Sequence, residues 1–213
     1  MRDMDTQTPK HHAFWQGRYE AADTPADLPW DLGTIAPPLQ HYIDAHGQAL
    51  GLGRTPAPTL ASVGCGLGHD AAWCAQQGFS VTGFDFAPGA IEGATARYGE
   101  LATFVQADIF DLPAQYHGVF DVVLEHTCFC AIPPNRRADY VQAVKQLIKP
   151  SGWFVGLIFS PDDPDGPPYP SSPEELRALF SPVLTIETLA PVPPEQSHPK
   201  RAGYEWLLVG SKL

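Results

Sequence analysis

The stretch ASVGCGLGHDAAWCA, residues 61–75, opens with apolar residues, breaks into a glycine-rich turn and resumes as an alanine-rich segment. The pattern predicts a buried strand at Thr59–Val63 and a helix at Asp70–Gln77, with a tight turn between them. Glycines at positions 64, 66 and 68 can adopt positive φ and let a ligand approach the backbone closely. This turn is therefore the first candidate binding site in the chain.

Strands and helices alternate along the rest of the sequence. The predicted strands are Ser80–Phe84, Thr103–Ala107, Val119–Leu124 and Trp153–Phe159, and the predicted helices are Pro88–Tyr98, Asn135–Ile148 and Pro173–Phe180. Repeated strand–helix units predict an α/β fold with a doubly wound, mainly parallel sheet and ligands at the carboxyl ends of its strands. The last two strands, Val183–Leu189 and Tyr204–Val209, have no helix between them and predict an antiparallel edge. Three proline clusters, Pro25–Pro38, Pro161–Pro173 and Pro191–Pro199, are predicted to be loops.

The composition predicts one domain spanning residues 1–213, because a single hydrophobic core can serve up to roughly 250 residues. No apolar run approaches the roughly 20 residues that a membrane helix needs, and the polar start MRDMDTQTPKHH lacks the apolar segment of a signal peptide. The formal charge of −11 argues against nucleic acid or an anionic membrane surface as a partner, since both favour a basic face. We expect a cytoplasmic monomer that binds a small molecule.

The four cysteines, at positions 65, 74, 128 and 130, lie near predicted buried strands and turns, so we expect reduced thiols rather than disulfides. Cys128 and Cys130 have no second Cys/His pair at ligand spacing, and no metal site is predicted. Cys65, inside the glycine turn, is expected to be a small buried residue. Arg136 and Arg137 are expected on a solvated helix face.

The sequence of the glycine turn favours a cofactor without linked phosphates. A dinucleotide fingerprint, G-x-G-x-x-G, needs its third glycine at position 69, where this chain has His69. Asp70 follows in the predicted first helical turn, where its carboxylate would repel a pyrophosphate. S-adenosylmethionine carries a carboxylate that backbone N–H groups can bind and an ammonium group that acidic side chains or carbonyls can bind. The turn is therefore predicted to hold the amino-acid end of this cofactor.

Two acidic residues end the strands that follow the turn. Asp85 lies 21 residues after Gly64, at the spacing where a carboxylate accepts hydrogen bonds from both ribose hydroxyls. Asp108 ends the next predicted strand, where its carboxylate or the N–H group of Ile109 can contact the adenine edge. Together with the glycine turn, these positions predict a nucleoside-binding site.

Four stretches carry a resemblance that covers most of the chain. They are FWQGRYEAADTPADLPWDLGTIAPPL, VGCGLGHDAAWCA, VTGFDFAPGAI and FDVVLEHTCFCAIPPNRRADYVQAVKQLIKPSGW. With them the chain resembles the S-adenosylmethionine-dependent methyltransferases, and more closely the small-molecule branch that contains thiopurine, thiol and halide methyltransferases. This resemblance implies a Rossmann-like methyltransferase fold with seven strands and an antiparallel last strand.

The resemblance also implies where the cofactor binds. In that branch an aromatic N-terminal segment, here residues 1–40, folds over the cofactor. The implied contacts come from Trp15, Tyr19, Trp30, Gly64, Asp85, Asp108, Ile109 and His126, and the predicted cofactor set also includes Cys65, Gly66 and Phe86.

The sulfonium of this cofactor is already a good leaving group, so the enzyme mainly has to orient the reactants in a dry site. Aromatic faces near a sulfonium stabilise the cation, which gives Trp15, Tyr19 and Trp30 a physical role. Thr127 and Phe129, with Ala131 and Ile132, are predicted to line an apolar acceptor pocket.

A thiol acceptor must lose its proton, and Glu125 and His126 are then the candidate general bases, whereas a halide needs none. We therefore predict methyl transfer to a small thiol or a related soft nucleophile such as a thiopurine, selenide or halide. An oxygen or nitrogen acceptor, a sensor that binds S-adenosylmethionine without catalysis, and a nicotinamide oxidoreductase remain the alternatives.

Overall fold

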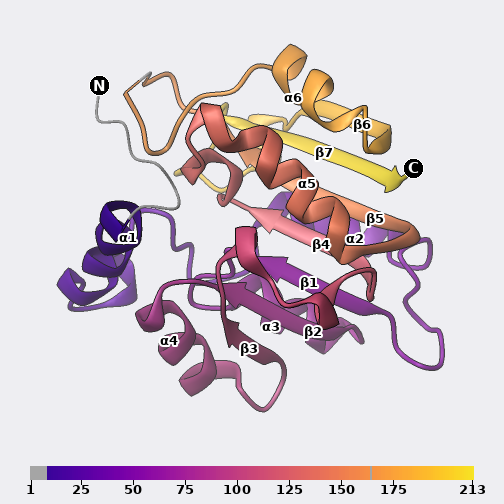
Figure 1. Ribbon diagram of the computed structural model, residues 1–213, viewed down its shortest axis with the longest axis horizontal. Coiled ribbons are helices and arrows are strands. Elements are labelled where there is room, and N and C mark those ends of the chain that lie inside the picture. The colour runs from indigo at the N-terminus through magenta and orange to yellow at the C-terminus, as the bar shows by residue number, and fades with distance from the viewer. Residues whose placement is uncertain (1–8, 164) are drawn as a thin grey trace.

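The computed structural model describes residues 9–163 and 165–213 and shows a seven-stranded sheet with helices on both faces (Figure 1). In spatial order the strands are β3 (Thr103–Gln106), β2 (Ser80–Asp85), β1 (Thr59–Val63), β4 (Phe120–His126), β5 (Ile148–Phe159), β7 (Glu205–Lys212) and β6 (Leu184–Pro191). This order confirms the predicted doubly wound α/β fold.

Most of the strands run in parallel. β1 pairs in parallel with β2 on one side and with β4 on the other, while β7 is antiparallel to both β5 and β6. In Figure 1 the arrowheads of β1 and β4 point toward α1 (Pro9–Ala21), and that of β7 points the opposite way. The predicted antiparallel pair is confirmed, although β7 lies inside the sheet and β6 forms its edge.

Two hydrophobic clusters attach helices to the two faces of the sheet. Tyr140 of α5 (Arg137–Leu147) and Phe180 of α6 (Pro173–Phe180) belong to one cluster. Ile43 of α2 (Pro37–His46) and Cys74 of α3 (His69–Gln77) belong to the other. Burial of these apolar faces fixes the sheet and its strand ends in place.

Several element boundaries differ from the prediction. The proline cluster Pro25–Pro38 was predicted to be a loop throughout, but α2 begins within it at Pro37, because proline is well tolerated in the first turn of a helix. Neither α1 nor α2 was predicted as a helix, and β5 begins at Ile148 rather than at Trp153. Helix α4 (Pro88–Tyr98) has its predicted bounds.

The direction in which the chain adds strands reverses between β1 and β4, which are neighbours in the sheet. In open α/β sheets such a reversal leaves a crevice at the carboxyl ends of the two strands, where ligands bind. Gly64 follows β1 and Thr127 follows β4, so the glycine turn and the predicted acceptor segment meet at this point.

Candidate functional site

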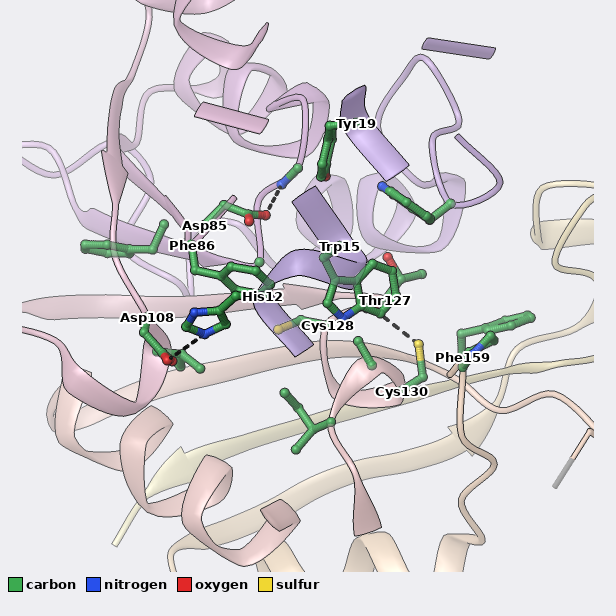
Figure 2. Close-up of a pocket in the computed structure, with 18 of the residues that line it drawn as sticks. His12, Trp15, Tyr19, Asp85, Phe86, Asp108, Thr127, Cys128, Cys130 and Phe159 are labelled. Atoms are coloured by element: carbon green, nitrogen blue, oxygen red, sulfur yellow. Dashed lines mark hydrogen bonds and ion pairs between the residues drawn. The ribbon is translucent and has the colours of Figure 1, made fainter. Parts of the chain in front are cut away.

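A cavity opens at this reversal point and encloses about 1040 Å³, including its open mouth. A space of this size is sufficient for a nucleoside cofactor and a small second molecule. Most of its lining comes from three parts of the chain: the glycine turn with the ends of β2 and β3, the N-terminal segment, and the residues that follow β4 (Figure 2). Phe159 at the end of β5, Pro168 and Arg201 complete the lining.

The glycine turn contributes Gly64 and Gly66 to the cavity wall. Both have left-handed backbone conformations, with φ of 59° and 52°. A Cβ at Gly64 would lie 2.7 Å from the sulfur of Cys128, so that position needs glycine for its space as well as for its φ. Cys65 does not line the cavity, and its side chain packs near Gly83.

Asp85 lies at the end of β2 and lines the cavity. One of its carboxylate oxygens accepts the N–H of Gly66 (3.0 Å) and the other accepts the N–H of Ala87 (2.9 Å). Burial raises the pKa of Asp85. Since a carboxylate can accept about four hydrogen bonds, both oxygens keep capacity for the hydroxyls of a bound sugar.

Asp108, Ile109 and Phe86 form the neighbouring part of the wall. One oxygen of Asp108 accepts the N–H of Phe110 (2.9 Å), and the other lies 3.2 Å from Nε2 of His12. The ring of His12 stacks on Phe86 with 4.5 Å between ring centroids, as Figure 2 shows. His12 thus makes the two kinds of contact, stacking and an edge bond to Asp108, that an adenine ring would make there.

Three aromatic residues of the N-terminal segment, Trp15, Tyr19 and Trp30, also line the cavity. Trp30 contacts Trp15 and Tyr19 edge to face, with centroid distances of 5.2 and 5.7 Å. Burial raises the pKa of Tyr19, so the phenol stays protonated. The aromatic surface keeps water away from this side of the cavity.

The acceptor segment after β4 supplies Thr127, Cys128, Cys130, Ala131 and Ile132. Thr127 has φ of 59°, an outlier for a β-branched residue and of the kind that clusters at functional sites. Burial raises the pKa of Cys128, and it raises that of Cys130 to about 12. These thiols stay protonated and are therefore poor nucleophiles toward an electrophile in the cavity.

The two candidate bases, Glu125 and His126, are not among the lining residues. One oxygen of Glu125 accepts the N–H groups of Cys128 (2.7 Å) and Phe129 (2.9 Å), and its pKa is raised by burial to about 7. Nδ1 of His126 lies 2.8 Å from Asp70. Burial is the largest single effect and lowers the pKa of His126, but the charge and hydrogen bond of Asp70, together with the charge of Glu205, outweigh burial and raise the pKa above its ordinary value.

Two other predicted positions lie away from the cavity. Phe129 is fully buried in the core, where it packs on Tyr140, Phe180 and the guanidinium of Arg137. Arg137 was expected on a solvated face, but it is 1% exposed and its Nη1 donates to Glu175 (2.8 Å), because the helix turns this position toward α6. Arg136, its neighbour, lies over the ring of Phe110.

The sequence reasoning missed several lining residues: His12, Cys128, Cys130, Phe159 and Arg201. Phe159 ends β5, so the strand-end rule that selected Asp85 and Asp108 could have found it. Cys128 and Cys130 belong to the segment already assigned to the acceptor. Arg201 lies in a loop before β7, and no pattern in the sequence pointed to it.

The lining residues fit S-adenosylmethionine. The turn at Gly64 and Gly66 exposes backbone to the cavity, and Asp85 can accept further hydrogen bonds. Asp108 and Phe86 bind the imidazole ring of His12, which is planar and contains nitrogen as adenine does. Among the described residues no group of three or more His, Cys, Asp or Glu side chains is arranged to hold a metal ion. None of the helices in the described ranges is long and apolar enough to cross a membrane.

Comparisons with known proteins agree with this assignment. The model of the thiopurine S-methyltransferase family matches residues 10–206. A probable thiol methyltransferase 2 from Arabidopsis thaliana is 32% identical over 200 residues, which cover 91% of this chain and 82% of that protein. Thiocyanate methyltransferase 1 from Brassica oleracea is 32% identical over 174 residues, covering 79% and 73%.

A solved structure gives the same fold. The 1,6-didemethyltoxoflavin-N1-methyltransferase of Burkholderia thailandensis, crystallised with 1,6-didemethyltoxoflavin and S-adenosylhomocysteine, superposes with a TM-score of 0.66 at 22% identity. The match covers 99% of this chain and 92% of that chain. At this identity the likeness establishes the fold and no more.

Proposed function

The chain belongs to the thiopurine S-methyltransferase family, and from this premise we propose that it transfers a methyl group from S-adenosylmethionine to a small thiol or a related soft nucleophile. One observation carries the proposal for the site. A single cavity brings together the glycine turn, Asp85, Asp108 and the aromatic residues Trp15, Tyr19 and Trp30. Family membership also decides between an enzyme and a sensor in favour of the enzyme, and against a nicotinamide oxidoreductase.

Each part of the cavity has a task in this proposal. When bound, S-adenosylmethionine supplies a methyl group on a positively charged sulfur, so that an acceptor lone pair displaces a neutral thioether. Backbone at Gly64 and Gly66 holds the amino-acid end, Asp85 accepts from the ribose hydroxyls, and Asp108 with Ile109 contacts the adenine edge. Trp15, Tyr19 and Trp30 exclude water and stabilise the positive charge.

In this proposal Glu125 and His126 do not contact the ligands, because neither residue lines the cavity. Glu125 holds the backbone of the acceptor segment through Cys128 and Phe129, and Thr127, the residue that follows His126 in the chain, lines the cavity. A base role would need a path for the proton from these buried groups to the cavity. We retain it as a hypothesis that the stability and turnover of a Glu125 variant will test.

The family relatives act on thiols and thiocyanate according to their names, which supports a sulfur acceptor here. We also propose that residues 1–213 form one domain, that residues 1–40 cap the cofactor, and that the enzyme is a cytoplasmic monomer. Residues 1–8 lie outside the described part of this segment. Light scattering after gel filtration tests the oligomeric state.

The test begins with binding. Calorimetric titration of the purified protein with S-adenosylmethionine, S-adenosylhomocysteine and NAD is expected to show binding of the first two and none of the third. Methyl transfer is then measured with thiols, thiopurines, iodide and small phenols by detection of the methylated products. Binding of NAD alone, or transfer to phenols alone, would contradict the proposed cofactor or the proposed acceptor class.

A pair of glycine variants supplies the control. Gly66 and Gly53 both have positive φ (52° and 86°), and a Cβ has room at both, with only the Tyr19 hydroxyl at 3.4 Å from the Gly66 position. Gly66→Ala and Gly53→Ala therefore introduce similar backbone strain, of about 1 kcal/mol. Only Gly66 lines the cavity, so only Gly66→Ala is expected to weaken cofactor binding.

A further inference from the structure

Thr127, the first residue of the acceptor segment, has a backbone conformation that is costly for a threonine. Within the described ranges two residues other than glycine have positive φ, Thr127 (59°) and Ser151 (60°). The left-handed region crowds a Cβ, and a β-branched side chain is crowded most. Gly64 has the same φ of 59° without this cost. The chain thus carries a threonine where glycine would be less strained, which indicates a role for the side chain.

The fold uses the backbone around Thr127 and leaves its hydroxyl free. The Glu125 carboxylate accepts the N–H groups of the two residues after Thr127, and the carbonyl of Thr127 accepts the thiol of Cys130 (3.2 Å), a bond drawn in Figure 2. The Thr127 hydroxyl has no hydrogen-bond partner in the described part of the chain. All the bonds that hold this turn are made by backbone groups, which glycine would also supply. The turn itself therefore does not require the threonine side chain.

Thr127 lies where the two ligands of the proposed reaction meet. Val63 of β1 pairs in parallel register with Glu125 of β4. Gly64 follows the first of these strands directly, and Thr127 follows the second. Both line the cavity, and a Cβ at Gly64 would lie 2.7 Å from the sulfur of Cys128. Because the glycine turn is proposed to hold the amino-acid end of the cofactor, which adjoins the sulfonium, Thr127 lies beside the methyl group in the proposed complex.

The Thr127 hydroxyl is also the only side-chain oxygen of the acceptor segment, residues 127–132. Ala131 and Ile132 are apolar, and the Cys130 thiol is bonded to the Thr127 carbonyl. A hydroxyl can donate one hydrogen bond and accept others. Because a β-branched residue is stiff at χ1, the direction of this hydroxyl is more restricted than that of a serine. An acceptor beside this segment therefore meets one free hydroxyl in a defined direction.

We infer that the Thr127 hydroxyl binds the reacting atom of the methyl acceptor and directs a lone pair of that atom toward the methyl carbon. This inference rests on the proposed function and assigns the contact that orients the acceptor in the same site. A thiol has lost its proton before this step, and the hydroxyl donates to its sulfur. A lone pair of that sulfur forms the bond to the methyl carbon, the electron pair of the broken carbon–sulfur bond stays with the cofactor sulfur, and the hydroxyl keeps its proton. Orientation of this kind lowers the barrier without any charge on the residue that supplies it.

The competing explanation is that the Thr127 side chain only fills the cavity wall and that the fold tolerates its strain. Ser151 offers a matched control, because it has the same backbone conformation and also carries a hydroxyl. Ser151 is exposed near the start of β5, whereas the cavity is lined by Phe159 at the end of that strand. Thr127→Gly and Ser151→Gly are both expected to relieve strain and to raise Tm by about 1 to 4 °C. Only Thr127→Gly is expected to change activity.

The experiment measures Tm, calorimetric binding of S-adenosylhomocysteine, and kcat/KM for benzenethiol and for iodide. Thr127→Val keeps the branched shape and removes the hydroxyl, whereas Thr127→Ser keeps the hydroxyl. For Thr127→Gly and Thr127→Val we expect at least about a tenfold loss of kcat/KM for benzenethiol, with changes below about threefold in the affinity for S-adenosylhomocysteine. Thr127→Ser is expected to stay within about fivefold of wild type, and Ser151→Gly to equal wild type. The loss for iodide is expected to stay below about threefold, because the electron density of iodide is the same in every direction and needs no orientation.

Benzenethiol kinetics that neither Thr127→Gly nor Thr127→Val changes would overturn the inference, and so would equal losses for benzenethiol and iodide. A loss in Thr127→Ser as large as in Thr127→Val would also overturn it, because the shape of the side chain would then matter and the hydroxyl would not. If Thr127→Gly does not fold, Thr127→Val and Thr127→Ser decide between these outcomes. A wild-type protein that binds no S-adenosylhomocysteine would count against the proposed function, and the inference would fall with it. An active wild type with unchanged variants would overturn the inference alone.

Discussion

Replacing Glu125 with glutamine is expected to remove a pH dependence from the stability of this fold. The Glu125 side chain is fully buried, and one oxygen accepts the N–H groups of Cys128 and Phe129. The other oxygen has no hydrogen-bond partner among the described residues. Burial is the largest effect on this carboxyl and raises its pKa from 4.5 to about 7.

The direction in which stability changes with pH follows from the proton that Glu125 holds in the folded state. Between pH 4.5 and about 7 the folded protein keeps a proton on Glu125 that the unfolded chain has released, so stability falls as the pH rises through this range. A pKa rise of this size corresponds to about 3 kcal/mol. For a chain of this length that free energy amounts to about 6 to 12 °C in Tm.

The assay is thermal unfolding of wild type and Glu125→Gln at pH 5 and pH 8. The wild type is expected to lose about 3 kcal/mol more than the variant between these pH values. Glutamine keeps an acceptor for both N–H groups, and any constant cost of its buried amide cancels in the difference between the two pH values. Glu92→Gln, at an exposed position of α4, is the matched control and should behave as wild type.

An unchanged pH dependence in Glu125→Gln would refute this reasoning, because it would mean that the backbone donors hold the carboxylate ionised despite its burial. The same variant also tests the base hypothesis. A general base for a thiol predicts a large loss of turnover with neutral thiols and little loss with iodide, which carries no proton. A purely structural role predicts similar changes with both acceptors.

Three further variants test the cofactor end of the cavity. Asp85→Asn should weaken S-adenosylhomocysteine binding about 10- to 100-fold, because a charged acceptor of hydrogen bonds is lost; calorimetry measures it, and unchanged affinity would remove Asp85 from the site. His12→Ala should tighten S-adenosylhomocysteine binding about 2- to 10-fold, because the His12 ring contacts Asp108 and Phe86 at the place where adenine is proposed to lie. Weaker binding would mean that His12 packs on the bound cofactor. Trp30→Leu should weaken S-adenosylmethionine more than S-adenosylhomocysteine, by about 2- to 20-fold, because only the former is a sulfonium; equal losses would exclude a cation contact.

The fold was largely predictable because hydrophobic periodicity and glycine and proline positions determine most of its elements. β1 and α4 have their predicted bounds, and β2 and α3 differ by a single residue from the prediction. The exceptions are the N-terminal region, where neither α1 nor α2 was predicted, and β5, which begins before its predicted start. The α1 segment PKHHAFWQGRYEA has almost no apolar face, since its Trp15 and Tyr19 line the cavity and do not form a core stripe.

The candidate site was predictable where a strand end selects the residue. Gly64, Asp85, Asp108 and Thr127 all follow or end parallel strands, and all line the cavity. The prediction was least informative for Phe129, where a short 3-10 turn directs the side chain into the core. Sequence spacing cannot give that direction, and it cannot show that a loop residue such as Arg201 reaches the far end of the same cavity.

The residues that break the dinucleotide fingerprint also explain how the N-terminal segment is attached. Asp70 was expected to act directly on the ligand, but it does not line the cavity; its carboxylate accepts the N–H of Ala36 (2.9 Å) and pairs with His126. His69 lies 3.1 Å from Asp31. Burial is the largest single effect and raises the pKa of Asp31, but the contact with His69 and the hydrogen bond from the N–H of Gly33 together outweigh burial and lower the pKa.

Position 69 and position 70 thus each bind the segment that follows Trp30, and they do so from the first turn of the helix that follows the glycine turn. A glycine at position 69, as a dinucleotide site requires, would leave Asp31 buried without its partner. The two residues that depart from the dinucleotide pattern, His69 and Asp70, therefore also hold the chain next to Trp30, which is part of the aromatic wall of the cavity. The residues that depart from the dinucleotide pattern therefore have a structural task in this chain, which is to hold the segment that covers the site.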